Sequence, residues 1–140
     1  MDSLTTRERS ERMGRIKAKD TKPEMLVRRL VHGMGFRYRL HDARLPGRPD
    51  LVFPGRRKAI FVHGCFWHRH ENCKLARLPK SRLEFWVPKL QANWERDQRD
   101  ARELGLLGWK VLIVWECELK DRMALAYRIR EFLERSESHE

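Results

Sequence analysis

The sequence contains no run of about 18 consecutive apolar residues, the minimum for a membrane-spanning helix. Its first residues, MDSLTTR, have no apolar signal core and lead straight into charge. It also has no internal repeat, no low-complexity linker and no sign of a second domain. These absences exclude an integral membrane protein and predict one compact domain of 140 residues that stays in the cytosol or the nucleoid.

Cysteine is scarce, and three cysteines, an odd number in a chain without an export signal, argue against disulfides. Cys65, His70 and Cys73 share one short segment, and Cys117 follows an apolar run. Structural zinc takes four nitrogen or sulfur ligands in a tetrahedron, commonly with some on one tight turn and the rest from elsewhere in the fold. The spacing therefore predicts a structural zinc site. The alternative is three buried thiols and a surface histidine.

Acidic residues are outnumbered, 20 against 31 basic residues, which gives a formal net charge of +11. Such an excess favours a polyanionic partner, because each phosphate contact releases a condensed counterion. A ribosomal or merely soluble basic protein would have the same charge. Basic residues are dense within positions 1–20, which we interpret as an arm lying over phosphates, with a solvated charged helix as the alternative.

The order of predicted elements is helix, three strands, helix, strand, helix. Residues 21–24 (TKPE) have a helix-capping pattern and open the first helix. Strands are predicted at residues 37–40, 50–53 and 58–62, with Pro-Gly turns between them, and at 110–115, where a continuous apolar run indicates burial on both faces. This order predicts an α/β fold in which helices flank a mixed sheet.

The two later helices have their own signals. Residues 81–84 (SRLE) form a second capping box, which opens a long helical stretch toward Gly108 that Pro88 should kink or divide. An amphipathic helix is predicted at residues 121–135, with Met123 on its inward face.

Carboxylates and histidines fall at neighbouring strand ends. Asp50 opens one predicted strand, His63 follows the next, and Glu24 could join them if the first helix crosses the sheet. Phosphodiester hydrolysis needs hard oxygen ligands for Mg²⁺ and a base that activates water. Asp50 suits the first role and His68 the second. The plain alternatives are a turn residue for Asp50, a capping partner for Glu24 and a surface position for the histidine.

Aromatic residues interrupt the polar segment that carries the cysteines. Phe66 and Trp67 lie inside it, and Trp86 follows the second capping box. Apolar side chains can wedge between DNA base steps, and aromatic faces can stack on bases. We favour DNA contact over a core position for these rings, and we assign to the core Trp94, Trp109 and Trp115.

Together these residues resemble the very short patch repair (Vsr) endonuclease family. The likeness runs from about residue 8 to residue 117 and rests on five segments: 45–50 (LPGRPD), 60–68 (IFVHGCFWH), 84–86 (EFW), 95–97 (ERD) and 108–117 (GWKVLIVWEC). Members of the family have a restriction-endonuclease-like fold. They nick one DNA strand 5′ of the thymine in a T:G mismatch, which arises when 5-methylcytosine deaminates.

The resemblance implies a role for each matching residue. Asp50 would be the central Mg²⁺ ligand and His68 the base, while His63 would contact phosphate or water at the metal. Glu24 would be an auxiliary acid and Asp97 a supporting partner. Structural zinc would bind Cys65, His70, Cys73 and Cys117, and the residues entering the DNA stack would be Phe66, Trp67, Trp86 and, from the arm, Met13.

Two departures from the family pattern concern the metals. Val62 stands where the best-described relatives have threonine, and it can serve Mg²⁺ equally well only through its main-chain carbonyl. Residues 70–73 (HENC) are one residue longer than a compact His-x-Cys spacing.

The resulting expectation is a basic DNA-contacting arm (1–20) and a single endonuclease domain (21–140), acting as a monomer on double-stranded DNA that contains a T:G mismatch. Whether mismatch-repair proteins recruit it stays open. One rival is a nicking nuclease of the same fold with another DNA target. The other is a zinc-ordered DNA-binding module without catalysis, which would need neither Asp50 nor His68.

Overall fold

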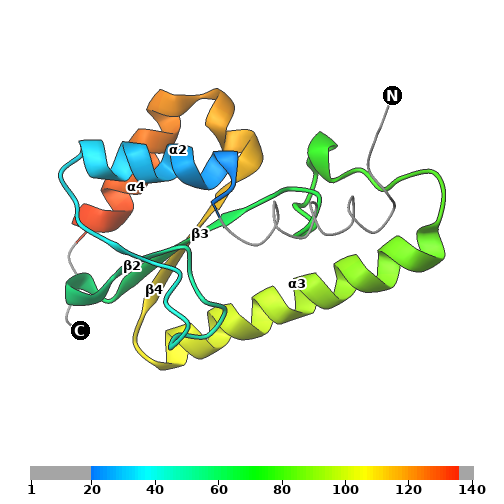
Figure 1. Ribbon diagram of the computed structural model, residues 1–140, viewed down its shortest axis with the longest axis horizontal. Helices are drawn as coiled ribbons and strands as arrows, with labels where there is room; N and C mark the ends of the chain where they lie inside the picture. Colours follow the sequence, from blue (N-terminus) through cyan, green and yellow to red (C-terminus); the bar gives the residue numbers. More distant parts are fainter. Residues whose placement is uncertain (1–19, 136–140) are drawn as a thin grey trace.

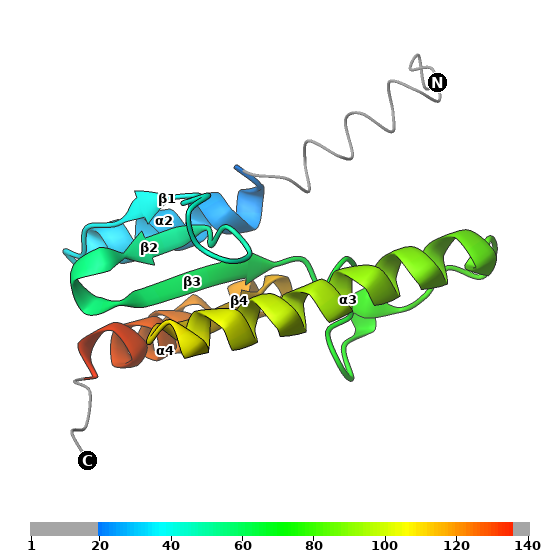
Figure 2. The same ribbon diagram turned by 90° about the horizontal axis from the view of Figure 1, so that it is seen from below.

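The computed structural model describes residues 20–135, which form a four-stranded sheet between helices (Figures 1 and 2). Its main elements are, in chain order, α2 (Lys22–Gly33), β1 (Arg39–Leu40), β2 (Leu51–Phe53), β3 (Lys58–His63), α3 (Leu83–Leu106), β4 (Lys110–Trp115) and α4 (Arg122–Glu134). The strand order is β1-β2-β3-β4, with β3 and β4 parallel and the other pairs antiparallel. The predicted mixed α/β sheet is confirmed. No described helix is long and apolar enough to cross a membrane.

The two faces of the sheet carry different helices (Figure 2). Alternate residues of a strand point to opposite faces. Ile60 of β3 packs into a core cluster with α2 and α4, whereas Phe61 and His63 line a small void with residues of α3. The alternation in β3 thus directs His63 toward α3, where the histidines and aspartates gather.

The main core lies between the sheet and the pair α2 and α4. Its buried members have aliphatic or aromatic side chains and come from α2, the sheet and α4. They are Val27, Val31, Leu51, Phe53, Ile60, Val114, Leu125, Ile129 and Leu133. Burial of such side chains contributes about 1.5–3 kcal/mol each relative to exposure. This core holds the sheet in place beneath the functional residues on the opposite side.

The predicted start of α2 is confirmed. The Thr21 side chain caps the helix by accepting the Glu24 N–H at 3.2 Å, and Pro23 lies in the first turn. The predicted start of α3 is wrong by one residue, because the N-cap is Arg82 and not Ser81. Arg82 has a left-handed conformation with φ 58° and makes no side-chain cap bond. Pro88 lies within a single 24-residue helix and does not divide it.

Three burial expectations are wrong. Met123 is 86% exposed and Trp94 is 37% exposed. In β4 only Val114 is fully buried, so this strand is not covered completely on either face. Apolar character and helical spacing predicted burial at these positions, but neither shows how far the neighbouring elements cover them. The predicted arm, with Met13, falls mostly outside the described residues.

Candidate active site

A hollow of about 580 Å³ lies where β3 ends, between the 41–50 loop and α3. Its lining includes four of the five residues predicted to take part in catalysis, namely Asp50, His63, His68 and Asp97, together with Val62 and the basic residues Arg48, Arg96 and Arg99. Residues far apart in the sequence therefore meet in one cavity, which combines carboxylates and imidazoles with positively charged walls.

Asp50 immediately precedes β2 and is anchored to the adjacent strand. Its Oδ2 accepts the Val62 N–H at 2.7 Å. Burial raises the pKa of Asp50 to about 7; the Val62 hydrogen bond opposes that rise and the nearby Glu24 carboxylate adds to it. A divalent cation would favour the charged form of Asp50. A hard carboxylate oxygen facing a polar cavity is chemically suited to Mg²⁺.

His68 is oriented by a carboxylate on α3. Its Nδ1 lies 2.5 Å from Asp97 Oδ2, and both side chains are partly buried. An ionised carboxylate only accepts hydrogen bonds, so Nδ1 carries the proton and Nε2 keeps a lone pair. The pair thus holds His68 in the tautomer that a general base requires.

His63 supports the His68 ring from below. The two rings stack with centroids 3.8 Å apart and planes 5° apart. Burial, and after it the adjacent His68, lower the pKa of His63 to about 3, so His63 is neutral at physiological pH. One donor atom from each of His63, His68 and Asp97 lies within 4.8 Å of the others, so these three side chains could also hold a metal ion. His63 Nδ1 is buried without a hydrogen-bond partner among the described residues.

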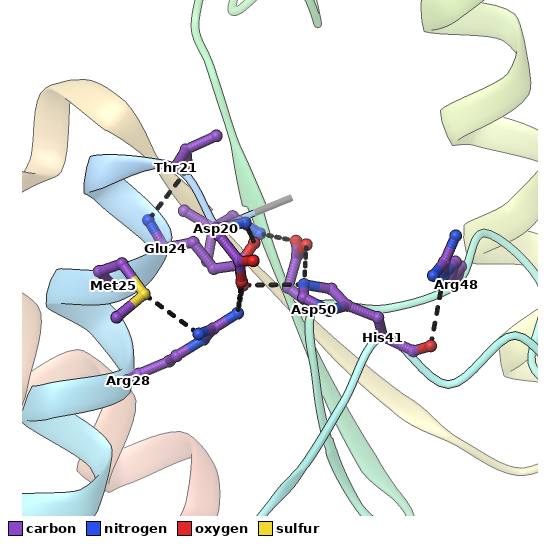
Figure 3. A network of polar contacts seen from close by, with 9 residues as sticks. Asp20, Thr21, Glu24, Met25, Arg28, His41, Arg48 and Asp50 are labelled. Carbon is purple, nitrogen blue, oxygen red and sulfur yellow. Dashed lines mark hydrogen bonds and ion pairs between the residues drawn. The ribbon is translucent and has the colours of Figure 1, made fainter. Parts of the chain in front are cut away.

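Glu24 lies in the same polar network as Asp50 (Figure 3) but is not among the residues that line the cavity. It is 2% exposed, its Oε1 accepts the Asp20 N–H at 3.2 Å, and its Oε2 contacts Arg28 and His41. Glu24 is therefore more than a capping partner. His41 was not among the predicted site residues, because nothing in its local sequence marks it; only the fold brings it to Glu24.

The four predicted zinc ligands lie together. One donor atom from each of Cys65, His70, Cys73 and Cys117 falls within 4.8 Å of the others. Cys117 Sγ is 3.5 Å from His70 Nδ1. Tetrahedral zinc takes such sulfur and nitrogen donors at about 2.0–2.3 Å, so this donor set fits zinc. Burial raises the pKa of Cys65 to about 12, and a bound cation would favour its thiolate.

Three successive residues at the end of β4 connect this cysteine cluster to the cavity. Trp115 stacks on His70 at 4.0 Å between ring centroids and meets His63 edge-on at 5.3 Å. Glu116 Oε1 accepts the Cys65 N–H at 3.2 Å, and Cys117 belongs to the cluster itself. The position of His63 thus depends on the same segment as the cysteine cluster.

The three aromatic residues predicted to contact DNA form a separate cluster, in which Phe66 and Trp67 meet Trp86 of α3. Phe66 and Trp86 have ring centroids 5.3 Å apart, and Trp67 lies 5.9 Å from Trp86, all edge-to-face. The Trp67 carbonyl accepts a hydrogen bond from Asn93 on α3. These rings are half-buried, and Phe85 beside them is 45% exposed. The cluster thus presents aromatic edges to solvent.

Comparison with known proteins places this chain in a family. A family described as "DNA mismatch endonuclease Vsr" matches residues 1–75. DNA mismatch endonuclease Vsr of Escherichia coli is 47% identical over 130 residues, covering 89% of this chain and 83% of that protein. The chain belongs to the Vsr family. It is therefore an endonuclease that acts on DNA.

Other Vsr-like relatives carry a different name. Type II nicking enzyme V.XorIIP of Xanthomonas oryzae pv. oryzae is 50% identical over 135 residues, covering 96% of this chain and 98% of that protein. Type II nicking enzyme V.NmeAIP of Neisseria meningitidis is 44% identical over 128 residues, covering 91% of each. Among solved structures, "Homing Endonuclease I-Bth0305I Catalytic Domain" matches with a TM-score of 0.56 and 22% identity, over 81% of this chain and 94% of that chain. This last likeness concerns the fold alone.

Proposed function

We propose that the protein is a Mg²⁺-dependent endonuclease that nicks one strand of double-stranded DNA 5′ of the thymine in a T:G mismatch. The observation that carries this proposal is the meeting of Asp50, His68 and Asp97 at one cavity. Membership of a mismatch endonuclease family and relatives named nicking enzymes support both the reaction and the substrate. We assign the sheet to the restriction-endonuclease-like class on the same grounds.

The chain's own residues divide the chemistry between them. Asp50 and the main-chain carbonyl of Val62 would hold Mg²⁺, which when bound neutralises charge on the phosphate. His68 Nε2 takes the proton from the attacking water, and Asp97 stabilises the imidazolium that results. His63 supports the site by contact with phosphate or water and by its stack on His68. Glu24 acts as an auxiliary acid next to Asp50.

Recognition of the mismatch would depend on the aromatic cluster. Phe66, Trp67 and Trp86 lie together with edges exposed, and insertion of such rings between base steps unstacks DNA. Met13, on the basic arm at residues 1–20, would enter from the other groove. The remainder, residues 21–140, would act as one endonuclease domain. One nicked strand requires only a monomer, and such a protein would work at the nucleoid.

Structural zinc at Cys65, His70, Cys73 and Cys117 would order the segment that carries His68 and Phe66. The ligands and the functional residues alternate along this segment, so fixing the first group positions the second. The zinc therefore supports a reaction in which it takes no chemical part.

The test compares T:G and C:G duplexes of identical sequence in Mg²⁺ buffer. We expect nicking of the thymine strand of the T:G duplex alone, abolished in Asp50→Ala while the zinc content stays unchanged. His32→Ala, an exposed histidine in the last turn of α2, is the matched control and should behave as the unmodified protein. Equal cutting of both duplexes would reject mismatch specificity and favour another DNA target; binding without cutting would favour the non-catalytic module.

A further inference from the structure

His41 occupies a constrained position just after β1. Its N–H donates to the Asp50 carbonyl at 3.2 Å, and its own carbonyl accepts a bond from Arg48 Nε at 3.3 Å. Its φ of 45° is in the left-handed region, which residues other than glycine adopt only when the surroundings hold them there. The backbone therefore holds the main chain of His41 beside Asp50.

The side chain of His41 lies between two carboxylates (Figure 3). Its Nε2 is 2.8 Å from Glu24 Oε2 and 3.9 Å from Asp50 Oδ1, and the side chain is 12% exposed. The shorter distance is a hydrogen bond and the longer is not. His41 thus binds Glu24 and packs against Asp50.

The two oxygens of Asp50 have different surroundings. Oδ2 is held by the Val62 N–H at 2.7 Å, whereas Oδ1 faces the His41 ring. Arg28 and His41 both bind Glu24 Oε2, and the Glu24 carboxylate held in this way also interacts with Asp50 and raises its pKa. Two carboxylates in one buried region repel each other, and the pair would rearrange if Glu24 were released.

We propose that His41 is a positioning residue of the metal centre: it restrains Glu24 and keeps the Asp50 carboxylate oriented for a divalent cation. This inference rests on the proposed role of Asp50 as a Mg²⁺ ligand. Groups that hold a metal ligand from behind commonly change metal affinity by about 10–100-fold when they are removed.

The test compares His41→Leu with His41→Gln. Both variants retain a side chain of similar length, and both accept the left-handed backbone with similar difficulty, but only glutamine can donate a hydrogen bond to Glu24. A role in filling space predicts equal behaviour, whereas a role in holding Glu24 predicts that glutamine rescues function.

Two measurements read out the effect. Binding of Mn²⁺, used in place of Mg²⁺, is followed by electron paramagnetic resonance on the zinc-loaded protein, with Asp50→Ala as the background. Nicking under single-turnover conditions is followed against Mg²⁺ concentration. For His41→Leu we expect Mn²⁺ affinity about tenfold weaker and a matching rise in half-saturating Mg²⁺. His41→Gln should return both values to within about threefold of the unmodified protein, and the DNA affinity of the zinc-loaded protein without added Mg²⁺ or Mn²⁺ should not change in either variant.

The results distinguish a failure of the role of His41 from a failure of the assignment of Asp50 as a metal ligand. Unchanged Mn²⁺ affinity in His41→Leu, or equal losses in the leucine and glutamine variants, would overturn the role of His41. A loss confined to DNA affinity would overturn it as well. If Asp50→Ala keeps both Mn²⁺ binding and Mg²⁺-dependent nicking, the metal assignment fails instead, and the failure belongs to the proposed function.

Discussion

At the scale of single residues, the proposed basicity of His68 depends on its two neighbours. Asp97 accepts its Nδ1 hydrogen at 2.5 Å, and the neutral His63 ring stacks beneath it at 3.8 Å. Asp97 determines which nitrogen presents a lone pair, and the stack on His63 restrains where that lone pair points.

Substitution of His68 and Asp97 should be strongly non-additive. We expect His68→Asn to lower the nicking rate by about 10²–10⁴-fold, the usual contribution of a general base. Asp97→Asn should lower it less, and the double variant should be no slower than His68→Asn alone, because Asp97 acts only through His68. Single-turnover rates measure this, with zinc content and DNA affinity as controls. If the losses of the two single variants multiply in the double variant, Asp97 has a task that is separate from His68.

Most of this site could be predicted from the sequence, because Asp50, His63 and His68 lie at strand ends or on one short segment. Their types also match the chemistry of phosphodiester hydrolysis. His41 could not, since its importance comes from a contact 17 residues away with Glu24. An isolated histidine in a loop gives no periodic signal, and only its backbone bond to Asp50 places it there.

At the scale of elements, the segment between β3 and α3 has little regular structure of its own. Among the described residues it contains one short 3-10 turn, Lys74–Ala76. The cysteine cluster and the contacts with Glu116 and Asn93 are what hold it. We therefore expect the order of this segment to depend on the proposed zinc more than on burial.

Removing one ligand should separate this segment from the rest of the fold. We expect Cys117→Ser to lose its zinc and to open the segment to trypsin at Lys74 and Arg77, while far-ultraviolet circular dichroism changes little because the main core does not include the cluster. Nicking should fall with the zinc content. Metal analysis and timed proteolysis measure this, with Ser81→Ala as a control. A Cys117→Ser protein with full zinc and the original protease resistance would contradict the assignment.

Element boundaries were predictable where a local bond defines them. Thr21 caps α2 as its spacing predicts, because the bond to Glu24 is local. The similar pattern before α3 misleads, because Arg82 takes the left-handed cap and its guanidinium lies over the Phe85 ring instead. Met123 failed for another reason: helical spacing places it near the inward face, but α4 meets α2 elsewhere.

At the scale of the whole molecule, positive charge is placed where a strand of DNA would pass the cavity. Arg48 lies on one wall and Arg96 and Arg99 on the other, from α3. Neither α3 arginine forms a direct ion pair in the described part of the chain, although both influence Asp100. Guanidinium groups on both walls suit a phosphate backbone.

The salt dependence of DNA binding should report these contacts. We expect the double variant Arg96→Ala/Arg99→Ala to reduce the slope of log K against log salt by about 2, since each phosphate contact contributes about 0.9. The matched control Arg29→Ala/Arg122→Ala removes the same charge from α2 and α4, across the sheet, and should leave most of the slope. Binding titrations at several salt concentrations measure it. Equal slopes for the two double variants would mean that net charge, rather than position, attracts the DNA.

The end of β4 has a consequence for how the chain can vary in length. Trp115, Glu116 and Cys117 each make a different contact, with His63 and His70, with the Cys65 N–H, and with the cysteine cluster. Inserting or deleting one residue here would exchange these partners all at once. Asn72, in contrast, is exposed in the turn between His70 and Cys73, two of the proposed zinc ligands. Evolution should therefore change the spacing from His70 to Cys73 far more readily than the spacing from β4 to Cys117.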